Sequence, residues 1–396
     1  MNLLVIGNGF DLAHHLPTRY SDFLDFMTLC ITNYVQYWHS FKDNLKVAEV
    51  EIYTGYSAIL DGLSRKIAPD SKVSALFNVN KEIFKSELID KGLIENFYKN
   101  SVLRYCLYVY AYKQFFGREY NWIDIENELL KLLTELQSKN FDKAPLDKIF
   151  INLPRRNGAG KLVTEKFYIP TIAAALKSQN IPPEFVRQDV FQYLFNELED
   201  FSLMLKLYLK LVRDDFNSAE APAPEKIFKI NANQGISVDS VLSFNYTDTA
   251  KIYVPKDSIY FVNGSLDDPQ IILGVENPSI EKTADYTNDN IHLFFKNVQR
   301  VLYDFHYEYA SKMRINRDFG IAVHVIGHSL APSDRYILTD VMMRADIVTI
   351  YYYTEKDKQS KIANLYQILG DELFTKHVNN PESTPRIELV PQKSIS

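Results

Sequence analysis

The first nine residues of the chain constrain its fold more than any other segment. Residues 3–6 are consecutive apolar residues, Leu-Leu-Val-Ile, and a Gly7-Asn8-Gly9 turn follows at once. A short apolar run without alternating polar residues is typical of a strand that is covered on both faces, as in a parallel sheet. The opening therefore predicts an α/β fold whose sheet contains this strand.

The other strand-like segments lie far away, after about residue 230. They are short runs rich in valine, isoleucine and tyrosine, and they alternate with helical patterns, as expected of an α/β sheet. The predicted strands lie within residues 238–245, 258–264, 270–274, 321–327, 346–353 and 386–390. One long amphipathic helix is predicted over residues 291–313 and a shorter one over residues 333–344. The apolar positions of the long helix are Phe294, Val298, Val301 and Phe305.

The region between these parts is mainly helical in pattern. Apolar residues recur at helical spacing from about residue 22 onward, a loop at residues 154–160 interrupts them, and residues 217–226 form a proline-rich linker. The simplest architecture is a Rossmann-like parallel sheet with a large helical insertion. The predicted domains are a nucleotide-binding α/β domain of residues 1–21 plus 230–396, and a helical insertion of residues 22–229.

Composition narrows the function classes. The net charge of −6 argues against general nucleic-acid binding, which needs a basic surface. The two cysteines, Cys30 and Cys106, cannot form a four-thiolate zinc site, and we expect both to be buried. The most apolar later segment, residues 101–116, is interrupted by Arg104 and Lys113, so a buried helix is expected rather than a membrane span. Without a signal-peptide pattern, the expected location is cytoplasmic, away from membranes.

The opening turn has two interpretations that the sequence leaves open. Gly7 and Gly9 after a buried strand allow the backbone to approach a ligand, and the next helix offers free N–H groups. The third glycine of the dinucleotide fingerprint is missing, because that position holds Leu12. The alternative is a plain glycine turn with Asp11 as the helix cap. An anionic Asp11 would repel a phosphate, so it suits a sugar hydroxyl, a water molecule or proton transfer.

Polar residues follow three predicted strands. Asn245 and Thr247 follow one strand, Asn263-Gly264 follow the next, and Gly327-His328-Ser329 follow a later one. In an open parallel sheet, such strand ends face the ligand crevice. The alternatives are ordinary turn roles: side-chain caps at Asn245 and Thr247, a turn pair at Asn263-Gly264, and a turn histidine at His328.

A Trp-x-Asp-x-Glu pattern occurs at Trp122, Asp124 and Glu126, and Glu128 follows. On a helix Asp124 and Glu128 share a face, but Asp124 and Glu126 do not. The pattern is compatible with an exposed acidic face over an apolar core.

Together, these segments resemble the bacteriophage abortive-infection AbiH family. The resemblance rests on the LLVIGNGFDLAHHLPTRYSDF opening, the Trp122-x-Asp124-x-Glu126 helix, VLSFNYTD, the strand before Asn263-Gly264-Ser265, and GHSLAPSD. It spans the chain in order. It implies an antiphage role in a bacterium.

The chain is also similar, more distantly, to the NAD-binding domains of sirtuins. Asn245 falls where that fold has its catalytic asparagine, and Gly327 and Ser329 match a Gly-x-Ser that lines the adenosine ribose. Asn263 stands in place of the sirtuin histidine, and Thr247 in place of an aspartate. The resemblance implies a sirtuin-like crevice for NAD or a related adenine nucleotide.

These expectations combine into one leading hypothesis, an antiphage protein that cleaves the N-glycosidic bond of a nucleotide. Asn245 would position the ribose or a water molecule, Asp11 would stabilise positive charge or accept a proton, and His14 would donate to Asp11 or to the ligand. Asn263 completes the candidate catalytic set. The candidate nucleotide-binding residues are Gly7, Asn8, Gly9, Phe10, Thr247, Gly264, Gly327, His328 and Ser329.

Two alternatives remain. One is a non-catalytic, nucleotide-gated sensor whose insertion contacts a phage protein. The other is a metal-dependent nuclease in which Asp11, Asp124 and Glu126 meet, although the leading hypothesis predicts no metal. A homo-oligomer and a phage-protein trigger are further expectations.

Overall fold

A computed structural model provides the structure of the chain, and it describes most residues. The described residues are 1–34, 59–85, 100–116, 123–137, 150–156, 162–168, 186–218, 226–232, 235–276, 290–305, 308–315, 320–378 and 386–394.

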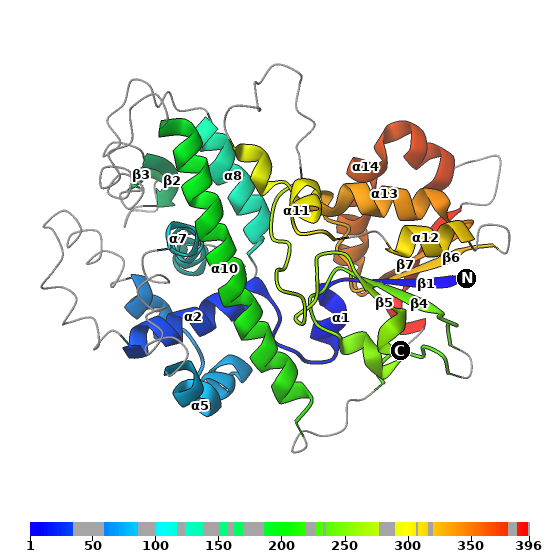
Figure 1. Cartoon of the computed structure of the whole chain (residues 1–396), viewed down its shortest axis with the longest axis horizontal. Helices are drawn as coiled ribbons and strands as arrows, with labels where there is room; N and C mark the ends of the chain where they lie inside the picture. The colour runs from blue at the N-terminus through cyan, green and yellow to red at the C-terminus, as the bar shows by residue number, and fades with distance from the viewer. Residues whose placement is uncertain are drawn as a thin grey trace, which may run out of the picture. The chain divides into compact units, whose positions relative to one another are not determined.

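A six-stranded parallel sheet confirms the α/β prediction. Its strand order is β5-β4-β1-β6-β7-β8, which matches the 3-2-1-4-5-6 order of Rossmann folds when the six strands are numbered along the chain. Figure 1 shows the N-terminal β1 among strands that come from the second half of the chain. The strands are β1 (Asn2–Ile6), β4 (Ser240–Ser243), β5 (Ile259–Phe261), β6 (Ala322–Ile326), β7 (Ile347–Tyr352) and β8 (Ile387–Pro391).

Strand β1 lies between β4 and β6 and is covered on both faces. Its Leu4 pairs with Val241 on one side and with His324 on the other. Leu3 and Val5 belong to one buried apolar cluster, whereas Leu4 and Ile6 belong to another. Because neighbouring residues of a strand point to opposite faces, the unbroken apolar run is explained by burial on both sides.

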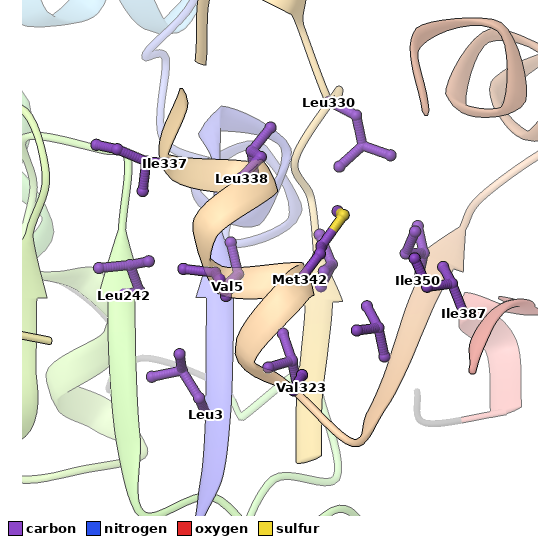
Figure 2. Packing of buried hydrophobic residues seen from close by; sticks show 14 of the residues in the cluster. Leu3, Val5, Leu242, Val323, Leu330, Ile337, Leu338, Met342, Ile350 and Ile387 are labelled. Carbon is purple, nitrogen blue, oxygen red and sulfur yellow. The ribbon is translucent and has the colours of Figure 1, made fainter. Parts of the chain in front are cut away.

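Helices α12 (Glu308–Ile315), α13 (Arg335–Arg344) and α14 (Glu355–Val378) supply residues to the cluster on the first face. Figure 2 shows Leu338 and Met342 of α13 beside Val5 and other strand residues. Fully burying an aliphatic side chain of this size stabilises a fold by roughly 1.5–3 kcal/mol. The expected helix over residues 333–344 is thus confirmed as a core-packing helix.

The opposite face is covered by the short helix α1 (Asn8–Ala13) and by chain segments near β4. The ring of Phe10 stacks on Phe228 at a centroid distance of 5.3 Å and meets Tyr253 edge-on at 5.8 Å. This aromatic cluster anchors α1 to the sheet. The short 3₁₀ helices among the described residues are η5 (Thr249–Ile252), η6 (Lys256–Ser258), η8 (Ile291–Phe294), η10 (Pro332–Asp334) and η11 (Gln392–Ser394).

The described part of the insertion is mainly helical, as expected. Cys30 and Cys106 are buried there, and residues 101–116 form a helix with a buried face, as predicted. No helix in the described part of the chain is both long enough and apolar enough to span a membrane. The described helices there are α2 (Tyr20–Tyr34), α5 (Lys72–Lys85), α7 (Ser101–Phe116), α8 (Ile125–Gln137) and α10 (Val186–Phe216).

The described chain forms two compact units. They are unit 1, with Met1–Thr18, Val212–Ile272 and Gln299–Ser396, and unit 2, with Arg19–Leu211 and Leu273–Val298. The predicted domain boundaries stay a prediction.

Three local expectations differ from the structure. The long helix over residues 291–313 is wrong, because the chain breaks into η8, α11 (Lys296–Leu302) and α12. Phe295 is extended, with φ −81° and ψ 128°, and Asp304 is left-handed, with φ 57°. Val301, expected on the apolar face, is 79% exposed.

The strand expected at residues 270–274 is also wrong, because this segment joins no sheet. Ile271 and Ile272 are nevertheless buried, and the Ile272 N–H donates to the Asn263 carbonyl. The loop expected at residues 154–160 overlaps an antiparallel hairpin of β2 (Phe150–Arg156) and β3 (Leu162–Tyr168). The apolar run at residues 270–274 therefore reflects burial of its side chains and not pairing in a sheet. The second difference arises because Pro154 lies within β2 and pairs with Thr164, although proline and glycine favour a loop.

Candidate functional site

The strand order of the sheet defines where a ligand is expected. From β1 the chain passes to β4 and β5 on one side and then returns to β6, β7 and β8 on the other, so the switch point lies between β1 and β6. Ligands of open α/β sheets bind beyond the carboxyl ends of the strands at such a point. The loops that begin there are those of Gly7 after β1 and Gly327 after β6.

The glycines of these two loops approach each other. The Gly9 N–H donates to the Gly327 carbonyl at 2.8 Å, and the Phe10 N–H donates to the Gly7 carbonyl at 2.8 Å. Gly327 has φ +67°, and a Cβ atom there would lie 2.1 Å from the Phe10 nitrogen. The glycines therefore allow close loop packing, and the N–H groups of Gly9 and Phe10 are already used within the fold. The predicted ligand-binding roles of Gly7, Gly9, Phe10 and Gly327 stay predictions.

Asn245 reaches the same place from the neighbouring strand. It follows β4, is buried, and donates from Nδ2 to the Gly7 carbonyl at 3.1 Å. The structure thus brings Asn245 together with the turn after β1.

Asp11 is the most unusual group of the site. Its side chain is 1% exposed, and its Oδ2 accepts a 2.5 Å hydrogen bond from Thr247 Oγ1. Thr249 Oγ1 lies 3.3 Å from Thr247 Oγ1 and extends the hydroxyl chain. Oδ1 of Asp11 is buried and accepts no hydrogen bond from any residue that the structure describes.

Burial controls the acidity of Asp11. It raises the pKa of this carboxyl to about 6, while the nearby polar side chains of Thr247, Thr249 and Asn245 partly oppose the rise. The helix-cap interpretation of Asp11 is wrong, because the cap of α1 is Gly7 and no side chain caps the helix. Asp11 lies inside the helix and turns toward the residues after β4. A buried carboxyl with a pKa near neutrality and a free oxygen atom is suited to proton transfer.

His14 belongs to the aromatic cluster around Phe10 and not to the polar groups around Asp11. Its Nδ1 contacts the Phe10 carbonyl at 2.8 Å and its Nε2 contacts the Tyr253 hydroxyl at 2.9 Å. Nδ1 must donate to the carbonyl, so in the neutral ring Nε2 accepts the Tyr253 proton. Burial lowers the pKa of His14, which agrees with a neutral ring. The expected hydrogen bond from His14 to Asp11 is not present, because both ring nitrogens have other partners.

Asn263 and Gly264 lie in a separate hydrogen-bond cluster. Asn263 Nδ2 donates to the Phe244 carbonyl at 3.3 Å, and its Oδ1 accepts from Arg300 Nη2 at 3.0 Å. Gly264 has φ +79°, and a Cβ atom there would meet the Phe305 ring at 2.7 Å. The amide of Asn263 thus holds the chain just before Asn245.

His328 and Ser329 are turn residues. His328 Nδ1 accepts the Leu330 N–H at 2.9 Å, and its ring meets Phe244 edge-on at 4.4 Å. Because Nδ1 accepts, the ring N–H is on Nε2, which lies 3.5 Å from Asp334 Oδ2. Ser329 is exposed.

Asn8, at the start of α1, is exposed as well. Its Oδ1 accepts a 2.6 Å hydrogen bond from Thr18.

The acidic residues of the Trp-x-Asp-x-Glu pattern lie in unit 2 and bind protein groups. Asp124 accepts the Asn127 N–H at 3.0 Å, and Glu126 pairs with Lys296 at 2.8 Å. Glu128 is buried and pairs with two lysines, so the exposed acidic face is wrong at this position. Trp122 lies outside the described residues. No group of three or more metal-binding side chains gathers within the described residues.

Three residues of these clusters were not anticipated: Thr249, Tyr253 and Arg300. The Thr247-x-Thr249 spacing could have suggested a second hydroxyl, since both follow the same strand. Arg300 gave no such signal, because an arginine in a helical pattern normally indicates a solvated face.

Fold and site together define a Rossmann-like α/β protein with polar groups at its switch point. Residues 3–353 match the family model for bacteriophage abortive infection AbiH. Since the match covers most of the 396-residue chain, the chain belongs to the AbiH family and has a role in phage abortive infection. No curated protein and no solved structure matches the chain. The similarity to sirtuins stays a prediction.

Proposed function

We propose that this AbiH-family protein acts in abortive infection by binding NAD or a related adenine nucleotide at the switch point and cleaving its N-glycosidic bond. The observation that carries the proposal is the Asp11 carboxyl. It is buried beside the turn after β1, and its Oδ1 atom is free of hydrogen bonds from the described residues.

The chemistry of glycosidic cleavage suits this group. The sugar passes through an oxocarbenium-like state, which a nearby carboxylate stabilises, and a water molecule then needs a base. With a pKa of about 6, Asp11 is mostly ionised at pH 7.5. Thr247 donates to Oδ2 and so orients the carboxyl, while Oδ1 is left to act on the sugar or on the water.

Asn245 supports the reaction by position. Its amide is anchored on the Gly7 carbonyl and also stabilises the ionised Asp11, so its oxygen is the group that would orient a ribose hydroxyl or a water molecule. The rings of His14 and His328 bind protein groups through their nitrogens. Asp11 is therefore the base in this scheme, and no histidine is required.

The test uses the purified full-length protein with NAD, with and without phage lysate, and measures nicotinamide release by mass spectrometry. Asp11→Asn should lower the rate at least 100-fold, because the base is lost while Thr247 can still bond to the amide oxygen. Asp257→Asn is the matched control, since Asp257 is exposed and lies before β5, at the amino end of the strands. No nicotinamide release under either condition would reject the enzymatic function.

A nucleotide-gated sensor is the second candidate. It is favoured by the engagement of Asn263 with Arg300 and Phe244, which leaves no histidine or free amide at the sirtuin-like position. A sensor would retain an adenine nucleotide through purification without consuming it, and Asn245→Ala would abolish both retention and phage protection. The contacting phage protein and a homo-oligomer remain predictions of either scheme.

A further inference from the structure

A cavity of about 500 Å³ lies beside β5, within unit 1 and apart from Asp11. Its walls come from β4 and β5, from residues 268–270, and from α11, the start of α12 and residues 303–305. The volume is within the range of small-molecule sites, which is roughly 300–1,000 Å³.

Arg300 is the buried charge of this cavity. The residue is 3% exposed; its Nε donates to the Val262 carbonyl at 3.2 Å and its Nη2 to Asn263 at 3.0 Å. No carboxylate of the described residues pairs with it, and its Nη1 donates to none of their atoms. A buried guanidinium without a counter-ion is costly, so an anion in the cavity would be bound strongly.

The other charged groups of the lining are acidic and lie nearer to solvent. Asp304 and Glu308 are exposed, while Asp268 is half-buried and already accepts the Ser265 N–H at 2.6 Å and its hydroxyl at 2.8 Å. The cavity thus has a cationic inner part and an acidic outer part. A ligand with charge of only one sign would pair with one of these two parts and not with the other.

Aromatic side chains form much of the remaining wall. Tyr260, Phe261, Tyr303, Phe305 and Tyr309 line the cavity together with the charged residues. Such rings bind a planar apolar body, and their faces attract cations as well.

We propose that this cavity is a binding site for a small aromatic zwitterion of the amino-acid class. The carboxylate of the ligand pairs with Arg300, its ring packs on the tyrosine and phenylalanine walls, and its ammonium group faces Asp304 and Glu308. The site is independent of the nucleotide chemistry proposed above, so it does not require an active enzyme.

Two hydrogen bonds connect Arg300 of this cavity with the residue before Asn245, which lies near the switch point. Arg300 holds Asn263, and Asn263 holds the Phe244 carbonyl, the residue before Asn245. The ligand would therefore bias the position of Asn245.

The test is calorimetric titration of the full-length protein with three probes that share one ring: L-phenylalanine, phenylacetate and 2-phenylethylamine. We expect L-phenylalanine to bind best, phenylacetate next and the amine weakest, because the buried Arg300 contributes more than exposed carboxylates. The absence of L-phenylalanine binding at millimolar concentration would overturn the proposal, and so would the reverse order of the two single-charge probes.

Substitutions test which side chain binds the carboxylate of the ligand and which side chain faces its ammonium group. Arg300→Gln should weaken L-phenylalanine binding at least tenfold, and Arg300→Lys should weaken it less. Because loss of the Val262 and Asn263 bonds can unfold these variants, the exposed Glu308→Gln provides the second test.

Glu308→Gln should weaken L-phenylalanine and strengthen phenylacetate, since a carboxylate that attracts the ammonium group repels a pure anion. The matched control is Glu372→Gln on the exposed side of α14, which should change neither affinity. A change of the same sign for both probes would overturn the assignment.

Discussion

Two aspartates of unit 1 have opposite surroundings. Asp11 is 1% exposed, has hydroxyl partners, and its pKa is raised to about 6 by burial. The side chain of Asp267 is 52% exposed, pairs with Arg213 at 2.7 Å and Lys256 at 2.8 Å, and its pKa is lowered to about 2 by those hydrogen bonds. The pKa of Asp11 thus lies above the ordinary value of an aspartate, and the pKa of Asp267 lies below it.

The difference separates a structural carboxylate from a candidate reactive one. Asp267 joins the end of α10 to the chain around η6, and both of its oxygens are used by cations. Among the described residues, no cation pairs with Asp11 and its Oδ1 accepts no hydrogen bond. A group that a fold holds at such a cost, at a switch point, is more readily explained by function than by stability.

We expect the largest effect from Gly327→Ala, because it displaces the helix that contains Asp11 and leaves Asp267 unchanged. The new Cβ would lie 2.1 Å from the Phe10 nitrogen, so α1 must move away from the sheet. We expect the free energy of unfolding to fall by more than about 3 kcal/mol in urea titrations. Gly370→Ala is the control, because its φ is +72° but nothing lies within 4 Å of the Cβ position. Equal losses in the two variants would show that the glycine contact is unimportant.

The next effect concerns the pH dependence of stability in Asp11→Asn. The folded pKa of Asp11 is raised above 3.8, so the charged form destabilises the fold, and the wild type loses stability as pH rises from about 4 to 6. The variant lacks this loss. Relative to wild type, it should gain about 2.5 kcal/mol between pH 4 and pH 7.5. Urea midpoints at several pH values measure the gain, and a difference that does not vary with pH would contradict the assignment.

A smaller effect should follow from Thr247→Val, which sharpens the comparison by removing the strongest hydrogen bond to Asp11. The pKa of Asp11 should rise further, by about one unit, because that bond stabilises the carboxylate. Thr249→Val should raise it less, since Thr249 lies 3.3 Å from the Thr247 hydroxyl. Carbon-13 NMR titration of the Asp11 carboxyl carbon measures both values. A larger shift in Thr249→Val would contradict the hydroxyl order.

The smallest effect is expected at Asp267. Asp267→Asn removes two ion pairs of a half-exposed group, which stabilise by at most about 1 kcal/mol and less at high salt. Because the folded pKa is lowered, this stability is present above pH 4 and is lost as pH falls toward 2. Urea titrations at low and high salt check this, and a salt-independent loss would contradict it.

Much of the fold follows from the sequence because it depends on local patterns. The apolar run of residues 3–6 required burial on both faces, and the later runs supplied parallel neighbours. The long helix over residues 291–313 failed because single residues, extended Phe295 and left-handed Asp304, break it while the apolar spacing continues. Their backbone conformations depend on tertiary contacts, which periodicity does not encode.

The site was predictable in location but not in its bonds. Strand ends placed Asn245 beside the turn after β1, and Nδ2 of Asn245 does bond to Gly7. The partner of His14 is Tyr253, 239 residues later, and the partner of Asn263 is Arg300. These pairings depend on side-chain directions set by packing, so spacing along the chain did not predict them.

The central position of β1 has a consequence for synthesis in the cell. Its hydrogen-bonding neighbours begin at Ser240 and Ala322, so the strand leaves the ribosome long before either exists. At a synthesis rate of about 5–20 residues per second, β4 follows β1 after roughly 10–50 s. During this time the apolar β1 segment has no strand to pair with. The switch point between β1 and β6 therefore forms only after residue 326 has been synthesised, although Asp11 is made among the first residues.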